Sequence, residues 1–74
     1  MPEFEALAQN TKKKRKEMGE TQLVFGMNCG ISKDEISNIE NAVTDPKLST
    51  MQNIAAYTGL TVSELLTKEG DEKK

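Results

Sequence analysis

The sequence predicts an all-α fold of five short helices. Apolar residues recur at steps of three and four through most of the chain, and no stretch alternates as a half-buried strand would. Glycines that can end a helix stand at Gly19, Gly30 and Gly59. Ser32 and Thr61 suit the N-cap positions of two helices that follow. These helix-end and helix-start signals favour a small helical bundle.

Composition limits the class of protein. The 74 residues suffice for one small domain, which we expect to span residues 1–69, with a disordered tail at 70–74. The single cysteine excludes an intrachain disulfide, and the absence of histidine excludes a Cys/His zinc site. No apolar run could span a membrane, and no segment has the pattern of a secretion signal. We expect a cytoplasmic protein with no metal, no cofactor and no membrane association.

No enzyme is indicated. The chain has no histidine, no nucleophile beside a base and no phosphate-binding glycine loop. The neighbouring acids Asp34 and Glu35 would point about 100° apart on a helix, so they cannot act on one substrate. We therefore expect no catalytic residues.

The charge is unevenly distributed. A net charge of −2 argues against a protein that simply coats nucleic acid. Residues 12–16 nevertheless form one basic block, Lys-Lys-Lys-Arg-Lys. Two interpretations stay open for this block. It is either a solvated helix face, as such runs usually are, or a surface on which Lys14 and its neighbours face a phosphate backbone.

Residues 1–20 are predicted to form the first helix, which Gly19 ends. Its apolar stripe ends on Arg15, at a place where an ordinary surface lysine would not be expected. The stripe consists of Phe4, Leu7, Ala8, Thr11, Arg15 and Met18.

A second helix is predicted to begin at Thr21, a good N-cap, and to place Phe25, Gly26 and Cys29 on its inner side. Gly30 ends this helix, because glycine readily takes a positive φ and lets the chain turn sharply.

A third helix follows directly. Ser32 is its predicted N-cap, and Glu35 three residues later completes a capping box. Ile36 and Ile39 lie three apart, so one side of this helix is expected to be buried and the opposite side free. Helix, glycine turn and capped helix together form a helix-turn-helix.

A loop and a fourth helix are predicted next. The loop covers residues 41–46, and the helix runs from Pro46 to Thr58 with Asp45 or Lys47 at its N-cap position. The sequence does not decide between these two caps.

A short fifth helix is predicted to start at a capping box formed by Thr61 and Glu64, and to bury Leu65 and Leu66. The predicted core consists of Leu7, Met18, Phe25, Cys29, Ile31, Ile36, Ile39, Leu48, Met51, Ile54, Leu60 and Leu65.

The chain resembles the Cro/repressor-type helix-turn-helix family of bacteria and phages. The resemblance extends from about Phe4 to Leu66 and depends on residues at the family's spacing. These are Thr21-Gln22, Gly30-Ile31-Ser32, Ile36-Ser37, Ile39-Glu40-Asn41, Pro46 and Gly59-Leu60-Thr61-Val62. The resemblance implies a five-helix repressor-like DNA-binding domain.

The resemblance also implies roles for single residues. The free side of the helix 33–40 would enter the major groove, with Lys33, Asp34, Ser37 and Asn38 at base edges. Asp34 is equally well explained as a helix-start charge, which the helix dipole favours. Contacts with the DNA backbone would come from Lys14, Thr21, Gln22, Ser32 and Thr44.

Two further implications concern the third helix. In the resembled family an arginine at the position of Arg15 pairs with the glutamate at the position of Glu40, which would join the first and third helices. The family usually has glycine where Ala42 stands, and Asn41 could adopt the left-handed conformation in its place.

The leading hypothesis is a sequence-specific transcriptional regulator, most simply a repressor, that binds double-stranded DNA as a homodimer. Candidate dimer surfaces are Leu23, Val24, Tyr57 and the fifth helix. The alternative is a protein-interaction module, antitoxin-like or anti-repressor, that contacts a protein partner through Leu23 and Val24 and binds little DNA.

Overall fold

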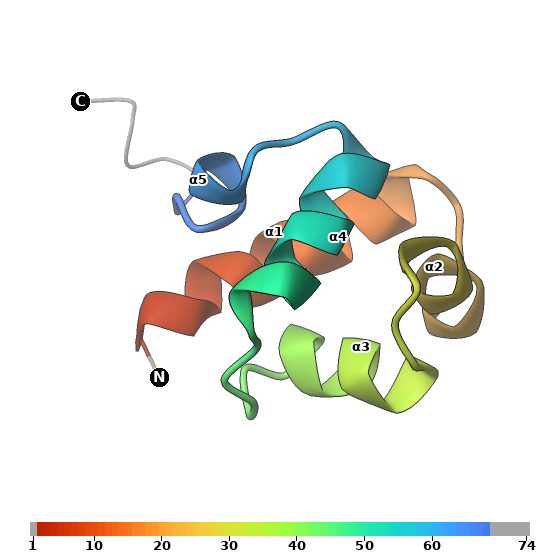
Figure 1. Ribbon diagram of the computed structural model, residues 1–74, viewed down its shortest axis with the longest axis horizontal. Helices are drawn as coiled ribbons and strands as arrows, with labels where there is room; N and C mark the ends of the chain where they lie inside the picture. The colour runs from red at the N-terminus through yellow and green to blue at the C-terminus, as the bar shows by residue number, and fades with distance from the viewer. Residues whose placement is uncertain (1, 69–74) are drawn as a thin grey trace.

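Five α-helices make up the described part of the chain, and no strand occurs within it (Figure 1). The computed structural model describes residues 2–68, so the tail predicted at 70–74 lies outside the described residues. The helices are α1 (Pro2–Glu17), α2 (Gln22–Cys29), α3 (Lys33–Glu40), α4 (Leu48–Thr58) and α5 (Val62–Leu65). The all-α prediction is confirmed.

The two short helices α2 and α3 pack against each other and against different parts of the bundle. α3 also contacts α1, and α2 also contacts α4, while α5 contacts both α1 and α4. α3 therefore lies along one edge of the molecule, with the rest of the chain on its inner side (Figure 1).

Every helix contributes a side chain that is almost completely buried. These are Leu7, Phe25, Ile36, Ile54 and Leu65, each exposed by 1% or less. Burying one such side chain stabilises a fold by about 1.5–3 kcal/mol, so the five helices are held mainly by this shared core. The ring of Phe25 also meets that of Tyr57 edge-on, with centroids 5.5 Å apart.

Three residues predicted to be buried are exposed. Met18 is 36% exposed, Leu48 58% and Leu66 38%. Each lies at or just outside a helix end, where the helical spacing no longer sets the direction of the side chain: Met18 and Leu66 follow the last residues of α1 and α5, and Leu48 is the first residue of α4. The prediction was wrong at these three positions because it extended the helical period past the ends.

Helix ends differ from the prediction by two or three residues. α1 stops at Glu17 rather than at residue 20, and Gly19 takes a left-handed φ of 71° in the turn that follows. α4 starts at Leu48 with Lys47 at its N-cap, which decides between the two predicted caps. The side chain of Lys47 forms no capping hydrogen bond, so backbone geometry and the preceding proline begin this helix without a side-chain cap.

The left-handed residue after α3 is Ala42, with a φ of 58°, whereas Asn41 has a φ of −94°. The prediction that Asn41 would take this conformation was wrong. Asn41 continues the helical path and closes α3 through its own N–H, which donates to the carbonyl of Ser37. The turn is therefore made one residue later, at a position where alanine pays a steric cost.

Replacing Gly26 with alanine should destabilise the protein by about 1–3 kcal/mol, although alanine is intrinsically the better helix former. A Cβ at this position would overlap the carbonyl oxygen of Ile31 and lie 3.2 Å from Cγ1 of Ile36. The overlap is with backbone, which cannot rotate away. Urea unfolding of both proteins measures the change.

The control is Met27→Ala on the same helix, because Met27 is 70% exposed and its truncation should change stability by no more than about 0.5 kcal/mol. A Gly26→Ala variant as stable as the wild type would show that α2 and α3 can separate without cost.

Candidate nucleic-acid interface

The turn between α2 and α3 fixes the two helices at close range. Gly30 ends α2 with a φ of 75°, and the N–H of Ile31 then donates to the carbonyl of Gly26 over 2.8 Å. Gly26 is itself buried and lies against Ile36 of α3. The absence of a side chain at Gly26 lets this turn lie directly on α2, which sets the direction in which α3 leaves it.

α3 has one buried side and one free side. Ile36 and Ile39 are exposed by 0% and 2%, and they attach the helix to the core. Lys33, Asp34 and Asn38 are exposed on the opposite side. None of these three side chains forms a hydrogen bond or ion pair with another described residue. The free side of α3 therefore offers donors and acceptors to another molecule.

Ser32 and Ser37 complete this surface. The Ser32 hydroxyl accepts a hydrogen bond from the Glu35 N–H over 3.1 Å. The Glu35 side chain forms no bond to the Ser32 N–H, so the prediction that Glu35 completes a capping box was wrong and only its hydroxyl half is formed. Ser37 is half-buried at the edge of the free side, and its hydroxyl has no partner within the described chain. Among the four predicted base contacts, Ser37 is therefore the least accessible.

The residues predicted to contact a DNA backbone are mostly engaged within the protein. The Thr21 hydroxyl caps α2 by accepting from the Val24 N–H, and the Gln22 amide donates to Glu40 over 3.1 Å. Thr44 is half-buried in the segment after α3. Thr21 and Gln22 thus lie at the start of α2. The bond from Gln22 to Glu40 places Gln22 beside the C-terminal end of α3.

Arg15 joins α1 to the end of α3. Its guanidinium makes two parallel bonds to the Glu40 carboxylate, 2.7 Å from Nε to Oε2 and 3.0 Å from Nη2 to Oε1, and a third to the Glu20 carbonyl. The two side chains are only 12% and 3% exposed. The hydrogen bond to Glu40 raises the pKa of Arg15 against the opposing effect of burial. A partly buried, bidentate pair of this kind holds a defined geometry.

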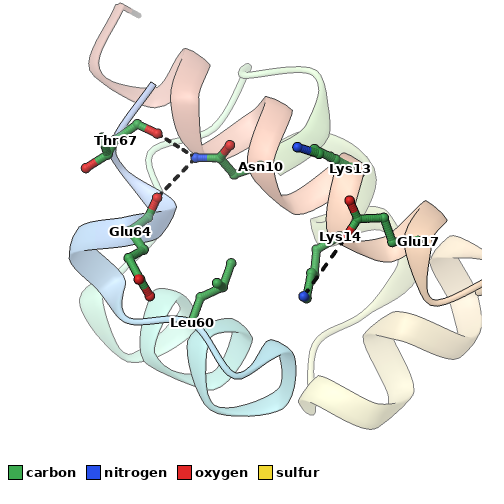
Figure 2. Close-up of a pocket in the computed structure, with 7 residues that line it drawn as sticks. All are labelled: Asn10, Lys13, Lys14, Glu17, Leu60, Glu64 and Thr67. Atoms are coloured by element: carbon green, nitrogen blue, oxygen red, sulfur yellow. Dashed lines mark hydrogen bonds and ion pairs between the residues drawn. The ribbon is translucent and has the colours of Figure 1, made fainter. Parts of the chain in front are cut away.

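Lys14 lies on a different side of α1 from Arg15. It lines a cleft with Asn10, Leu60 and Glu64, and its ammonium is 4.0 Å from the Glu17 carboxylate (Figure 2). Successive residues on a helix point about 100° apart, so Lys14 and Arg15 cannot both face α3.

Asn10 closes one end of this cleft. Its side-chain amide donates to the carbonyls of Glu64 and Thr67 at 3.2 and 2.9 Å (Figure 2). It also donates to the carbonyl of Leu65 at 2.9 Å. These bonds tie the end of α5, and the segment that follows it, to α1. The cleft is therefore where α5 is fastened to α1, on a different part of the molecule from the free side of α3.

A model of the helix-turn-helix family matches residues 12–65, well over half of the chain. The match covers the turn at Gly30, the buried isoleucines of α3 and both flanking helices. The chain belongs to the helix-turn-helix family. It is of the Cro/C1 type, as its sequence resemblance implies.

Among solved structures, this helix-turn-helix protein is similar to the crystal structure of a hypothetical transcription factor, NHTF, from Neisseria. The two have a TM-score of 0.88 and 24% sequence identity, over 96% of this chain and 82% of that chain. At this identity the likeness concerns the fold. No curated protein matches the chain.

Within residues 2–68 no helix is both long and apolar enough to cross a membrane. No group of three or more His, Cys, Asp or Glu residues in that range could hold a metal ion.

One polar network was not predicted from the sequence: it joins Tyr57 of α4 to Glu20 and to Asn28 of α2. The Tyr57 hydroxyl donates to the Glu20 carboxylate over 2.5 Å and accepts from the Asn28 amide over 2.7 Å. The bond to Glu20 raises the pKa of Tyr57, so the phenol stays protonated and keeps donating through the neutral range. A tyrosine late in an amphipathic helix is the only signal in the sequence, and it does not identify its partners.

Cys29 lies beside this network and is buried, as predicted. Burial, followed by the charge of Glu20, raises the pKa of the thiol to about 11. The thiol is therefore neutral near pH 7 and is a poor nucleophile, in agreement with a packing role.

Proposed function

We propose that the chain is a sequence-specific DNA-binding transcriptional regulator that reads the major groove with α3 and acts as a repressor. The free side of α3 carries this proposal: Lys33, Asp34 and Asn38 are exposed without internal partners, while Ile36 and Ile39 hold the helix from behind. The major groove of B-DNA is about 12 Å wide and admits an α-helix.

Each proposed base contact follows from the side chain's donors and acceptors. Lys33 would donate to O6 and N7 of guanine, Asp34 would accept from N4 of cytosine, and Asn38 would pair with N6 and N7 of adenine. Ser37 would donate or accept at the edge of the contact.

Contacts with phosphates would surround α3. Ser32 lies at the N-terminal end of α3, and Thr44 lies in the segment that follows α3. Thr21 and Gln22 begin α2, whose first backbone N–H groups lie near the C-terminal end of α3. Lys14 contributes least in this proposal, because it lines the cleft beside α5 and already pairs with Glu17.

A homodimer on double-stranded DNA is part of the proposal. One eight-residue helix offers only a few base contacts. Two copies related by a two-fold axis would bind half-sites roughly 10 base pairs apart and double the number of contacts. We propose repression because a dimer bound at a site inside a promoter would exclude other proteins from that DNA.

The experiment begins with selection of preferred duplexes from a random DNA pool, followed by titration of wild type and Asn38→Ala. The variant should lose about 1–3 kcal/mol of binding free energy and tolerate substitution at one base pair per half-site. The matched control is Asn53→Ala, since Asn53 is also exposed on a helix but lies on α4.

Base reading would be ruled out if Asn38→Ala lost the same binding free energy for every duplex sequence. It would also be ruled out if the wild type bound selected and scrambled duplexes equally well at every salt concentration. Replacing Lys33 with alanine should weaken binding more than replacing Lys14, because only Lys33 lies on the proposed reading face.

A second candidate function, a protein-interaction module, is favoured by the outer side of α2. Leu23, Val24 and Met27 are 52%, 42% and 70% exposed there. If the chain is a protein-interaction module, Leu23→Ser should abolish its binding to a protein partner. If the chain is a DNA-binding regulator, the same variant should still distinguish selected from scrambled duplexes.

A further inference from the structure

The cleft between α1 and α5 is large enough to hold a small molecule. Its volume is about 440 Å³, which lies within the range of about 300–1,000 Å³ that is usual for ligand sites. One wall is α1, and the other consists of α5 and the residues on either side of it (Figure 2). The free side of α3 contributes no residue to this cleft, so its role is separate from base reading.

The walls of the cleft are held in place from within the protein. The side-chain amide of Asn10 ties α1 to the end of α5 through its bonds to three carbonyls. Oε1 of Glu64 accepts from the Thr61 N–H over 2.8 Å, which fixes this side chain against the start of α5. Leu60 is half-buried and packs against the core. A ligand would therefore enter a cleft that is already formed, and would lose little affinity to ordering the protein.

Charges of both signs surround an apolar surface in the cleft. The charged side chains are Lys13, Lys14 and Glu17 on the α1 wall and Glu64 on the α5 wall, and Leu60 supplies the apolar surface. In the view of Figure 2, the Leu60 side chain lies between the Glu64 carboxylate and the Lys14 ammonium. A carboxylate, an apolar group and an ammonium thus follow one another across the cleft.

Lys14 and Glu64 can each form a further bond. The Lys14 ammonium is 4.0 Å from the Glu17 carboxylate, which is too long for a hydrogen bond, and the two side chains are 33% and 53% exposed. An exposed pair at this distance is weak, so another carboxylate can readily replace Glu17. Oε2 of Glu64 forms no hydrogen bond with another described residue.

We propose that this cleft binds a small molecule with an ammonium at one end and a carboxylate at the other end of a short apolar chain, which is the chemistry of an ω-amino acid. The carboxylate of the ligand accepts from Lys14 in place of Glu17. Its ammonium donates to Oε2 of Glu64, and its methylene groups cover Leu60.

The arrangement of charges favours this class of ligand over three others. The carboxylates of Glu17 and Glu64 repel a simple anion, and the lysines on the α1 wall repel a diamine. An α-amino acid carries both charges on one carbon, so it cannot reach groups on both sides of Leu60. A chain with its two charges at opposite ends matches both walls.

The test is a titration of the complete chain with 6-aminohexanoate, without DNA, so its outcome does not depend on the proposed function. The side-chain amide resonances of Asn10 and the methyl resonances of Leu60 should shift and saturate as the ligand is added up to about 50 mM. We expect millimolar binding, because both ion pairs form at a partly exposed surface. Hexanoate, hexylamine and glycine should each bind about fivefold more weakly, since each lacks one part of the match.

Two variants assign the two ends of the ligand. Glu64→Gln should bind 6-aminohexanoate no better than hexanoate, because it no longer distinguishes the ammonium. Glutamine can still accept from the Thr61 N–H, so the start of α5 is kept. Lys14→Gln should bind 6-aminohexanoate no better than hexylamine. Lys12→Gln is the matched control and should keep both preferences, because Lys12 is exposed on α1 outside the cleft.

Three results would overturn the proposal. The first is the absence of saturable shifts at Asn10 and Leu60. The second is equal affinity of the wild type for hexanoate and 6-aminohexanoate, which would make the cleft a site for simple anions. The third is a preference for 6-aminohexanoate that survives unchanged in both Glu64→Gln and Lys14→Gln.

Discussion

Replacing Arg15 with alanine should lower the free energy of unfolding by about 3 kcal/mol. The substitution would leave the Glu40 carboxylate, which is 3% exposed, with only the Gln22 amide as a hydrogen-bond donor. It would also leave the Glu20 carbonyl without the Arg15 Nη1 donor. A chain of 74 residues has a total stability of about 4–11 kcal/mol, so the variant should unfold at a much lower urea concentration.

A double variant distinguishes the net contribution of the ion pair from the cost of burying one unpaired charge. Replacing both residues with methionine, Arg15→Met with Glu40→Met, should recover most of the loss, because no unpaired charge remains. Arg15→Lys should be intermediate, since lysine keeps the charge but cannot form the two parallel bonds. A cost below about 1 kcal/mol for Arg15→Ala would mean that the pair is no more than a surface contact.

The pH dependence of this loss follows from the raised pKa of Arg15. A cation whose pKa is raised on folding contributes stability that is complete below its unfolded value and is lost only as pH rises through the folded value. Both values lie above the range in which the protein would be studied. Titration of Arg15 should therefore add no pH dependence to the stability of the wild type between about pH 6 and about pH 9, which urea unfolding at the two pH values measures.

Replacing Ile36 with alanine should cost about 2–5 kcal/mol, by lost burial and by the cavity left behind. Ile36 is 0% exposed and lies against Gly26, at the place where α3 is held to α2. The loss of this side chain should therefore loosen the attachment of α3 as well as lower global stability. Urea unfolding gives the first effect, and amide hydrogen exchange along α3 gives the second.

Ile36→Val is the matched control and should cost only about 0.5–1.5 kcal/mol. If the Ile36→Ala variant kept both its stability and its protection in α3, the isoleucines would not be what turns the polar side of the helix outward.

The fold was predictable because several signals agreed along the middle of the chain. Ser32 as a cap, Gly30 as a turn, and Ile36 and Ile39 at helical spacing all indicate the same third helix, and the structure has it at Lys33–Glu40. Local preferences and the buried pattern coincided there. At Met18, Leu48 and Leu66 only the apolar character was available, and that does not say where a helix ends.

The internal partners of the site were harder to predict. The contact between Gln22 and Glu40 joins residues on separate helices, and neither the type nor the spacing of the two residues specifies it. The family resemblance implies a phosphate contact for Gln22, and nothing local indicated that Gln22 would also donate to Glu40. Similarly, the helical direction of Lys14 toward the α5 cleft depends on where α5 packs, which is a tertiary property.

At Ala42 the kind of backbone conformation was predicted correctly, but it was assigned to the neighbouring residue, Asn41. The need for a left-handed residue after the third helix was evident, and asparagine is the more tolerant of the two candidates. The structure nevertheless assigns that conformation to Ala42, because Asn41 is retained by its hydrogen bond to Ser37. Backbone hydrogen bonding decided against side-chain preference.

The most direct measurement removes single acceptors from the major groove of the selected operator. Replacing one purine at a time with its 7-deaza analogue deletes N7 and leaves the minor groove and the backbone unchanged. At the positions read by Lys33 and Asn38, the wild type should lose about 5- to 150-fold in affinity, corresponding to 1–3 kcal/mol, and the matching alanine variant should lose much less. Equal affinity of the wild type for every 7-deaza duplex would contradict the claim that α3 reads bases.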